Sequence, residues 1–198
     1  DILGADHMDA YPDVLAGIEQ LGFNTNKIKV LIHQFVTLME KGEPVKMSTR
    51  KAQYITLDDL IDEVGQDVVR YFFLMRGMNT HLNFDLELAK NESDENPVYY
   101  LQYAHARLCN ILKHAESLGH EFDNKTNLSE LTLDSEILLI KSLLEFPNVV
   151  EKTHENLEPQ TIANYLQDLA GNFHRYYAHE RVVTEDSGQT SARLVLVQ

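Results

Sequence analysis

The chain reads Asn96-Pro97-Val98-Tyr99-Tyr100-Leu101-Gln102-Tyr103-Ala104-His105-Ala106-Arg107, and this segment begins its longest predicted helix. Proline suits the first helical turn, because the N–H groups of that turn have no partner within a helix. Gly119, beyond the last apolar residue, is a typical helix end. The pattern therefore predicts a helix from Pro97 to about Leu118.

This predicted helix has two unlike faces. At about 100° per residue, a set of aromatic and hydrogen-bonding side chains falls within about 40° of one line. We call this set the polar stripe, and its members are Asn96, Tyr100, Tyr103, Arg107, Asn110 and His114. Apolar residues occupy the neighbouring and opposite arc, at Leu101, Ala104, Leu108, Ile111, Leu112 and Ala115. The apolar arc is predicted to join a core.

The polar stripe has two interpretations. Tyrosine rings stack on unpaired bases, arginine stacks or pairs with phosphate, and asparagine pairs with a base edge, so the set suits a single-stranded RNA loop. Alternatively, the tyrosines pack under a neighbouring helix and keep only their hydroxyls in water. The spacing by itself leaves both open.

The remainder of the C-terminal half continues the helical pattern. Helices are expected over residues 133–155, with a kink or break at Pro147, from Glu158-Pro159 towards His179, and over residues 192–197 after a loop at 186–188. Polar connections between these segments predict an antiparallel helical bundle. Four side chains near the end of the third helix could face RNA or fill core and surface positions: His174, Arg175, Tyr176 and His179.

The N-terminal segment alternates between strand and helix patterns. Residues 1–7 indicate the end of a buried strand, residues 8–21 a helix that Gly22 closes, and residues 28–42 a second strand. This order predicts the tail of a Rossmann-like α/β nucleotide fold. Asp6 or Asp9 could also serve simply as a helix cap.

A basic segment follows the second predicted strand. Lys46, Arg50 and Lys51 fall within six residues, and no Asp or Glu occurs from Pro44 to Leu57. Glycine and proline before it indicate a loop, where mobile lysines can follow charge on phosphoryl oxygens. A basic turn with no function is the alternative.

Two short helices are expected next, over residues 57–64 and 66–75 with Thr56 as a cap, then an extended piece at 81–85 and a helix at 86–90.

Composition limits the possible classes. The 198 residues are 43% hydrophobic, which is enough for a core, and the net charge of −14 argues against non-specific adhesion to nucleic acid. No apolar run approaches the ~20 residues of a membrane span. The single cysteine forms no internal disulfide, and no spacing resembles a metal site. We therefore expect a cytoplasmic protein without a metal centre, and neither DNA nor a membrane as a partner.

Two N-terminal motifs resemble class I aminoacyl-tRNA synthetases. Residues 42–50, Gly-Glu-Pro-Val-Lys-Met-Ser-Thr-Arg, are similar to the Lys-Met-Ser-Lys-Ser loop as arginyl-tRNA synthetases have it. The resemblance implies catalytic roles for Lys46, Met47 and Ser48. Thr49 departs from the second lysine of that pattern, so Arg50 or Lys51 would supply the second cation. Residues 4–7, Gly-Ala-Asp-His, resemble the family's adenosine motif, so the ATP site implied by the resemblance contains Gly4, Asp6, His7, Lys46 and Arg50.

Residues 96–107 resemble the signature that opens the anticodon-binding domain of arginyl-tRNA synthetases, which implies tRNA contacts at Asn96, Tyr100, Tyr103 and Arg107. The implied division is a catalytic remnant at 1–53, a helical connector at 54–95 and an anticodon-binding bundle at 96–198. The fold class is then mainly α, after an α/β remnant.

By the same resemblance, the parent enzyme would activate arginine with ATP and Mg²⁺ and esterify it to tRNA(Arg). The chain contains no His-Ile-Gly-His motif, so we expect the 198 residues alone to be inactive. The rival is a non-catalytic helical module that binds a protein partner.

Overall fold

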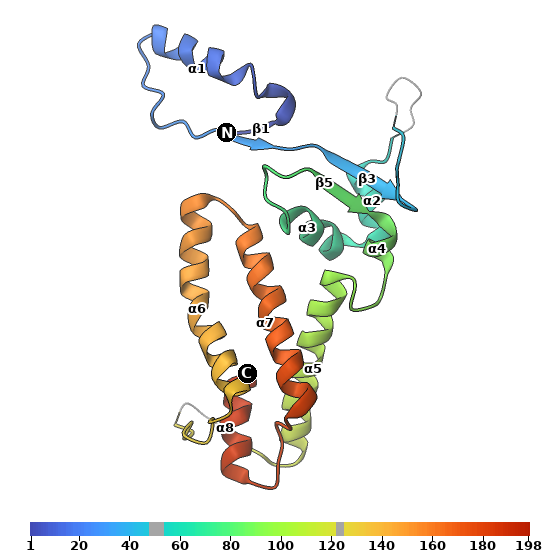
Figure 1. The fold of residues 1–198 in the computed structure, drawn as a ribbon, viewed down its shortest axis with the longest axis vertical. Helices are drawn as coiled ribbons and strands as arrows, with labels where there is room; N and C mark the ends of the chain where they lie inside the picture. The colour runs from blue at the N-terminus through green and yellow to red at the C-terminus, as the bar shows by residue number, and fades with distance from the viewer. Residues whose placement is uncertain (48–53, 122–124) are drawn as a thin grey trace. The chain divides into compact units, whose positions relative to one another are not determined.

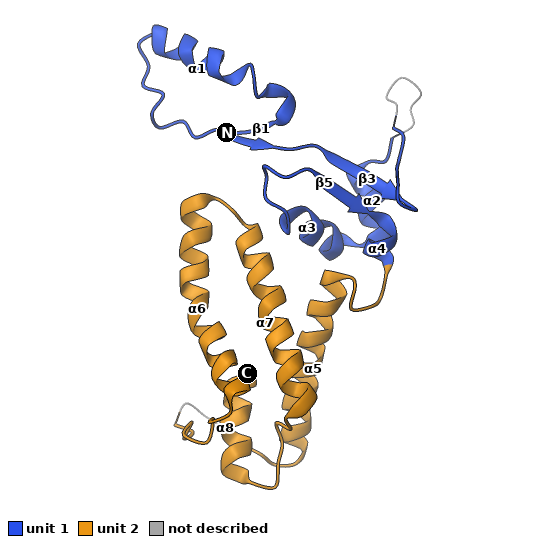
Figure 2. Cartoon of the chain, in the orientation of Figure 1, with its two compact units in different colours: residues 1–90 blue, residues 91–198 orange. Residues whose placement is uncertain are grey.

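The computed structural model describes residues 1–47, 54–121 and 125–198 (Figure 1). The chain forms two compact units, Asp1–Lys90 and Asn91–Gln198 (Figure 2). Helices dominate, so the prediction of a mainly α chain is confirmed. The predicted three-part division at residues 53 and 95 stays a prediction. None of the helices described is both long and apolar enough to cross a membrane.

Unit 1 begins with a small parallel sheet. Strand β1 (Ile2–Gly4) pairs with β2 (Leu31–His33), and a 3₁₀ turn and helix α1 (Tyr11–Gln20) connect them. The prediction that the first strand is buried was wrong, because Ile2 is 69% exposed and β2 is the only strand paired with β1 among the described residues. Helix α1 begins later than predicted, and Gly22, with φ of +88°, follows its end.

The single strand predicted over residues 28–42 is instead two strands in two sheets. Strand β3 (Val36–Glu40) lies parallel to β5 (Leu82–Asp85) and antiparallel to β4 (Glu43–Pro44). The backbone N–H of Gln34, between β2 and β3, donates to the carbonyl of Met78 at 2.8 Å. Met78 lies in a loop rather than in a strand, so strand pairing is interrupted between β2 and β3.

Three helices complete unit 1 as the sequence predicted. They are α2 (Leu57–Val64), α3 (Gln66–Leu74) and α4 (Leu86–Lys90). Thr56 caps α2 in a reciprocal capping box: its Oγ1 accepts from the Asp59 N–H at 3.1 Å, and Asp59 Oδ2 accepts from the Thr56 N–H at 2.9 Å. Phe72 and Phe84, both fully buried with ring centroids 5.1 Å apart, join α3 to β5.

Unit 2 is a helical bundle. It contains α5 (Pro97–Ser117), α6 (Asp134–Asn156), α7 (Gln160–His179) and α8 (Ser187–Val197). Consecutive long helices reverse direction, as predicted, so α5 and α7 run parallel to each other (Figure 1). Gln167 of α7 accordingly donates to the carbonyl of Pro97 at 2.8 Å, while Tyr177, further along α7, meets Arg107. The core of the bundle includes Ala104 and Ile111 from α5, Phe173 from α7 and Leu194 from α8.

In unit 2 the break predicted at Pro147 and the loop predicted at residues 187–188 were wrong. Helix α6 runs through Pro147 without a break. Proline removes the bond that its N–H would make to the carbonyl of Leu143, and because both residues are exposed, water can satisfy that carbonyl. Residues 187 and 188 are helical rather than loop, because the Asp186 carboxylate accepts from the N–H groups of Gly188 and Gln189 and starts α8 there.

Candidate nucleic-acid interface

A tight hairpin positions the start of the basic segment. Lys41 and Gly42 join β3 to β4 with φ of 53° and 78°, the pair of positive values that a type I′ turn requires. After β4, the Val45 N–H donates to the carbonyl of Leu38 at 2.8 Å. Lys46 and Met47 follow as exposed side chains. The other predicted residues of this segment, Ser48 and Arg50, lie outside the described residues.

The predicted nucleotide motif lies at the carboxyl end of β1. A Cβ built on Gly4 would collide with Asp6 Oδ1, so the carboxylate can fold back over the strand end only beside a glycine. Asp6 and His7 are both exposed, with Oδ2 and Nε2 3.7 Å apart. Neither Asp6 nor Asp9 caps α1, whose N-cap is Ala10 with no side-chain hydrogen bond. The Asp6 carboxylate is therefore exposed beside the Gly4 backbone, and the nucleotide contacts of Gly4, Asp6 and His7 stay predictions.

The first two members of the polar stripe lie inside unit 2. Asn96 is 3% exposed, and its Oδ1 accepts from the N–H of Val98 at 3.0 Å, so the side chain caps α5. Tyr100 is half-buried against α7: its ring centroid lies 4.7 Å from that of His174, and its hydroxyl lies over Gly171. Burial raises the pKa of the Tyr100 phenol. This part of the stripe follows the packing interpretation, and base contacts by Asn96 and Tyr100 stay predictions.

Tyr103 differs because it is 39% exposed. Its ring is parallel to that of Tyr99 within 3°, at 6.3 Å between centroids, and stacks on His174 at 5.7 Å. Burial lowers the pKa of His174, which keeps the imidazole neutral at pH 7. The Tyr103 ring is thus held by stacking inside unit 2, while the residue stays partly exposed to solvent.

Arg107 lies between two tyrosines from different helices. Its guanidinium carbon is 4.5 Å from the centroid of the Tyr103 ring and 5.2 Å from that of Tyr177, and Nη2 donates to the Tyr103 hydroxyl. Cation–π attraction holds the guanidinium at this position. The face of Tyr103 that Arg107 covers becomes open to a base only if the guanidinium moves, whereas the guanidinium plane is itself a stacking surface.

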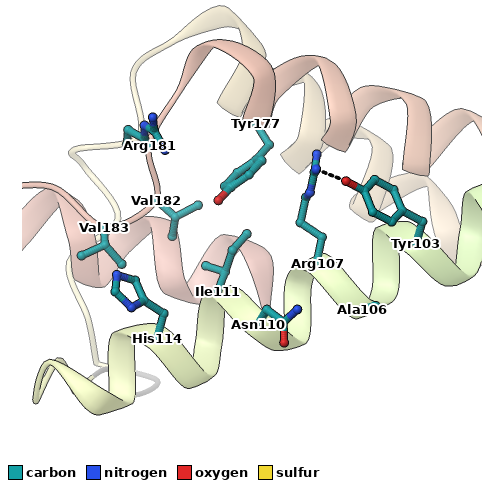
Figure 3. A pocket seen from close by; sticks show the side chains of 10 residues that line it. All are labelled: Tyr103, Ala106, Arg107, Asn110, Ile111, His114, Tyr177, Arg181, Val182 and Val183. Carbon is teal, nitrogen blue, oxygen red and sulfur yellow. Dashed lines mark hydrogen bonds between the residues drawn. The ribbon is translucent and has the colours of Figure 1, made fainter.

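The exposed half of the polar stripe forms one side of a pocket of about 510 Å³ (Figure 3). The opposite side comes from Tyr177 and from residues 181–183, which we call the wall segment. Ten side chains line the pocket: Tyr103, Ala106, Arg107, Asn110, Ile111, His114, Tyr177, Arg181, Val182 and Val183. The pocket therefore joins part of one helix to a segment about 70 residues away in sequence.

The pocket is locally cationic on an acidic protein. Arg107 and Arg181 border it, and none of the described residues lining it is acidic, although the chain carries a net charge of −14. Several N–H donors and two aromatic rings face a cavity large enough for a planar base. Such a set favours an anionic ligand with acceptor groups and a stacking face.

The sequence predicted the α5 side of this pocket but not the opposite side. Tyr103, Arg107, Asn110 and His114 were on the predicted stripe. The candidates for RNA contact on α7 were His174, Arg175, Tyr176 and His179, of which Tyr176 is only 1% exposed. Tyr177, Arg181 and Val183, which do line the pocket, were not among the predicted site residues. The Tyr176-Tyr177 pair gave no signal as to which ring is buried. Among the described residues, no cluster of three or more His, Cys, Asp or Glu could hold a metal ion.

Comparisons with known proteins identify relatives of the chain. Residues 101–198 match the family described as DALR anticodon binding domain. The chain is 52% identical over 196 residues to an arginine–tRNA ligase of Salinibacter ruber and 47% identical over 200 residues to one of Desulfotalea psychrophila. It is also similar to a solved structure described as an arginyl-tRNA synthetase of Campylobacter jejuni, with a TM-score of 0.84 and 35% identity.

These similarities cover nearly all of the chain but only part of each relative. The matches take in 99–100% of the chain, 35–36% of the two ligases and 43% of the Campylobacter jejuni protein. The chain thus spans about a third of the length of the curated relatives it matches. Residues 101–198 are a DALR anticodon-binding domain, and the chain belongs to the arginyl-tRNA synthetase family.

Proposed function

We propose that unit 2 binds the anticodon loop of an arginine tRNA in the pocket between α5 and the wall segment. The observation that carries this proposal is the pair Tyr103 and Arg107, held beside a cationic pocket within an anticodon-binding domain. Bases of an anticodon loop are unpaired, so their faces are free to stack on guanidinium and aromatic planes.

The proposed contacts divide by chemistry. A base would stack on the guanidinium plane of Arg107. The cation–π contact with Tyr103, at 4.5 Å, holds that plane in position. Arg181, exposed at the rim of the pocket, is suited to the loop phosphates. His114 and Asn110 present exposed polar groups to base edges.

For the whole protein we propose ATP-dependent activation of arginine and its transfer to tRNA(Arg), which feeds protein synthesis and so suits the cytoplasm. Gly4, Asp6 and His7 would border the adenosine, and Lys46 would stabilise negative charge on the phosphates. The described residues hold no metal-binding cluster of their own. Mg²⁺ would thus enter bound to the ATP phosphates.

The test of the anticodon proposal is a titration of the chain with a labelled arginine-tRNA anticodon stem-loop. Tyr103→Ala should weaken binding by ~1–3 kcal/mol, the range for one stacked base, because it removes the ring that holds the Arg107 plane in place. Tyr103→Phe is the matched control and should bind nearly as the unmodified chain does, because it keeps the ring. Equal affinity of the alanine variant and the unmodified chain would leave Tyr103 as packing only.

Salt dependence separates this proposal from a protein-binding module. Binding through phosphates weakens steeply as salt rises, whereas apolar docking of a protein barely changes.

We also expect no ATP–pyrophosphate exchange by the 198-residue chain, which lacks a His-Ile-Gly-His motif. Measurable exchange would show that the chain holds a complete adenylate-forming site.

A further inference from the structure

Arg193 forms a buried ion pair in unit 2. The residue is 3% exposed on α8, and its Nε donates to Oε1 of Glu136 at 2.7 Å, a carboxylate that is itself fully buried on α6. The other oxygen of Glu136 accepts from the Leu133 N–H at 3.0 Å. The ion pair therefore ties α8 to the first turn of α6.

The remaining nitrogens of Arg193 reach the wall segment. Nη1 donates to the backbone carbonyl of Arg181 at 2.6 Å, and Nη2 lies 3.4 Å from Oε2 of Glu180. Arg181 is the first residue of the wall segment and directly follows Glu180, the C-cap of α7. One guanidinium thus fixes the point at which the chain leaves α7 and begins to line the pocket.

A second side chain of α8 holds Thr184, the residue directly after the wall segment. Thr190 is fully buried, and its Oγ1 accepts from the Thr184 N–H at 2.9 Å. Thr190 and Arg193 are three residues apart and so lie on one face of α8. Between these two anchors, Val182 is 2% exposed and belongs to the bundle core. The wall segment is held from behind at both ends by the same helix.

We propose that Arg193, oriented by Glu136, is a positioning residue for RNA binding: it sets the wall segment at the distance from Arg107 that admits a base. The inference rests on the proposed function of the pocket. Arg193 itself does not touch the RNA, because it is buried behind the wall. A displaced carbonyl at Arg181 would move Arg181 and Val183 relative to α5 and change the width of the pocket.

The test uses Arg193→Lys in the 198-residue chain. Lysine keeps the charge opposite Glu136 but lacks the planar fork that reaches the Arg181 carbonyl at the same time. We expect a folded chain whose affinity for the arginine-tRNA anticodon stem-loop falls about ten-fold, roughly the effect of losing one stacked base. Hydrogen exchange should quicken at residues 182–184 and stay unchanged in α5. Arg70→Lys, at an exposed position on α3, is the matched control and should change neither readout.

A double variant covers the case in which the lysine variant does not fold. Glu136→Gln with Arg193→Met removes the fully buried ion pair as a whole, so that the carboxylate left without its cation is that of Glu180, whose side chain is 30% exposed. It should lose affinity to a similar extent, with the same faster exchange at residues 182–184. Unchanged affinity and exchange in a folded variant would overturn the positioning role while leaving the pocket intact. An unmodified chain that fails to bind the stem-loop would instead refute the proposed function, and this inference with it.

Discussion

Arg107→Lys tests whether the guanidinium acts as a stacking plane or as a charge. In the structure it lies 4.5 Å and 5.2 Å from the centroids of Tyr103 and Tyr177 and bonds to the Tyr103 hydroxyl. Lysine preserves the positive charge but has no planar face for a base. We expect binding of the anticodon stem-loop to weaken.

The expected magnitude follows from the contacts. A stacked base contributes about 1–3 kcal/mol, and lysine keeps part of the cation–π attraction, worth about 0.5–1 kcal/mol at an exposed site. The net loss should be about 1–2 kcal/mol, or roughly 5- to 30-fold in Kd. The fold itself should lose less than about 1 kcal/mol, because the core residues are untouched.

The assay is fluorescence anisotropy with a labelled stem-loop, repeated between about 50 and 200 mM salt. Because the charge is retained, the slope of log Kd against log salt should be the same for the variant and the unmodified chain. Helical circular dichroism provides the folding control. An unchanged Kd would refute stacking on Arg107, and a shallower slope would show that the guanidinium contacts a phosphate.

Three further predictions concern stability. Burial raises the pKa of Tyr176 from 10.0 to about 12, so only the unfolded chain ionises between those values and the free energy of unfolding should fall as pH rises through that window. Tyr176→Phe should flatten this decline in urea unfolding, and an equally steep decline would contradict it. Burial lowers the pKa of His174, so the unfolded chain takes up the proton first, and stability should fall as pH drops below about 6.5. His174→Gln should reduce that acid sensitivity in thermal unfolding at pH 5 to 7. Thr56→Ala should cost about 1 kcal/mol by removing the capping box. Its measure is several-fold faster amide exchange in α2, with no change in α7, and equal exchange rates in α2 would contradict it.

Sequence alone determined most of the helices, because their signals are local. Pro97, Thr56 and Gly119 act on hydrogen bonds within a few residues of themselves, and the structure confirms the helices that they delimit. Two predictions in unit 2 failed at local signals of the same kind. Pro147 was expected to kink or break a helix that continues through an exposed turn, and residues 187–188 were expected to be loop, although Asp186 caps α8 directly before them.

Tertiary structure decided which face of each helix is available. Tyr100 and Tyr103 are the same residue type on the same predicted line, yet α7 covers Tyr100 and leaves Tyr103 39% exposed. The partners of Arg107 and Arg193 come from segments distant in sequence, at Tyr177 and Glu136. Periodicity along a helix specifies only the angle at which a side chain leaves the axis. What lies at that angle depends on how separate helices pack, which is a long-range property that no local pattern contains.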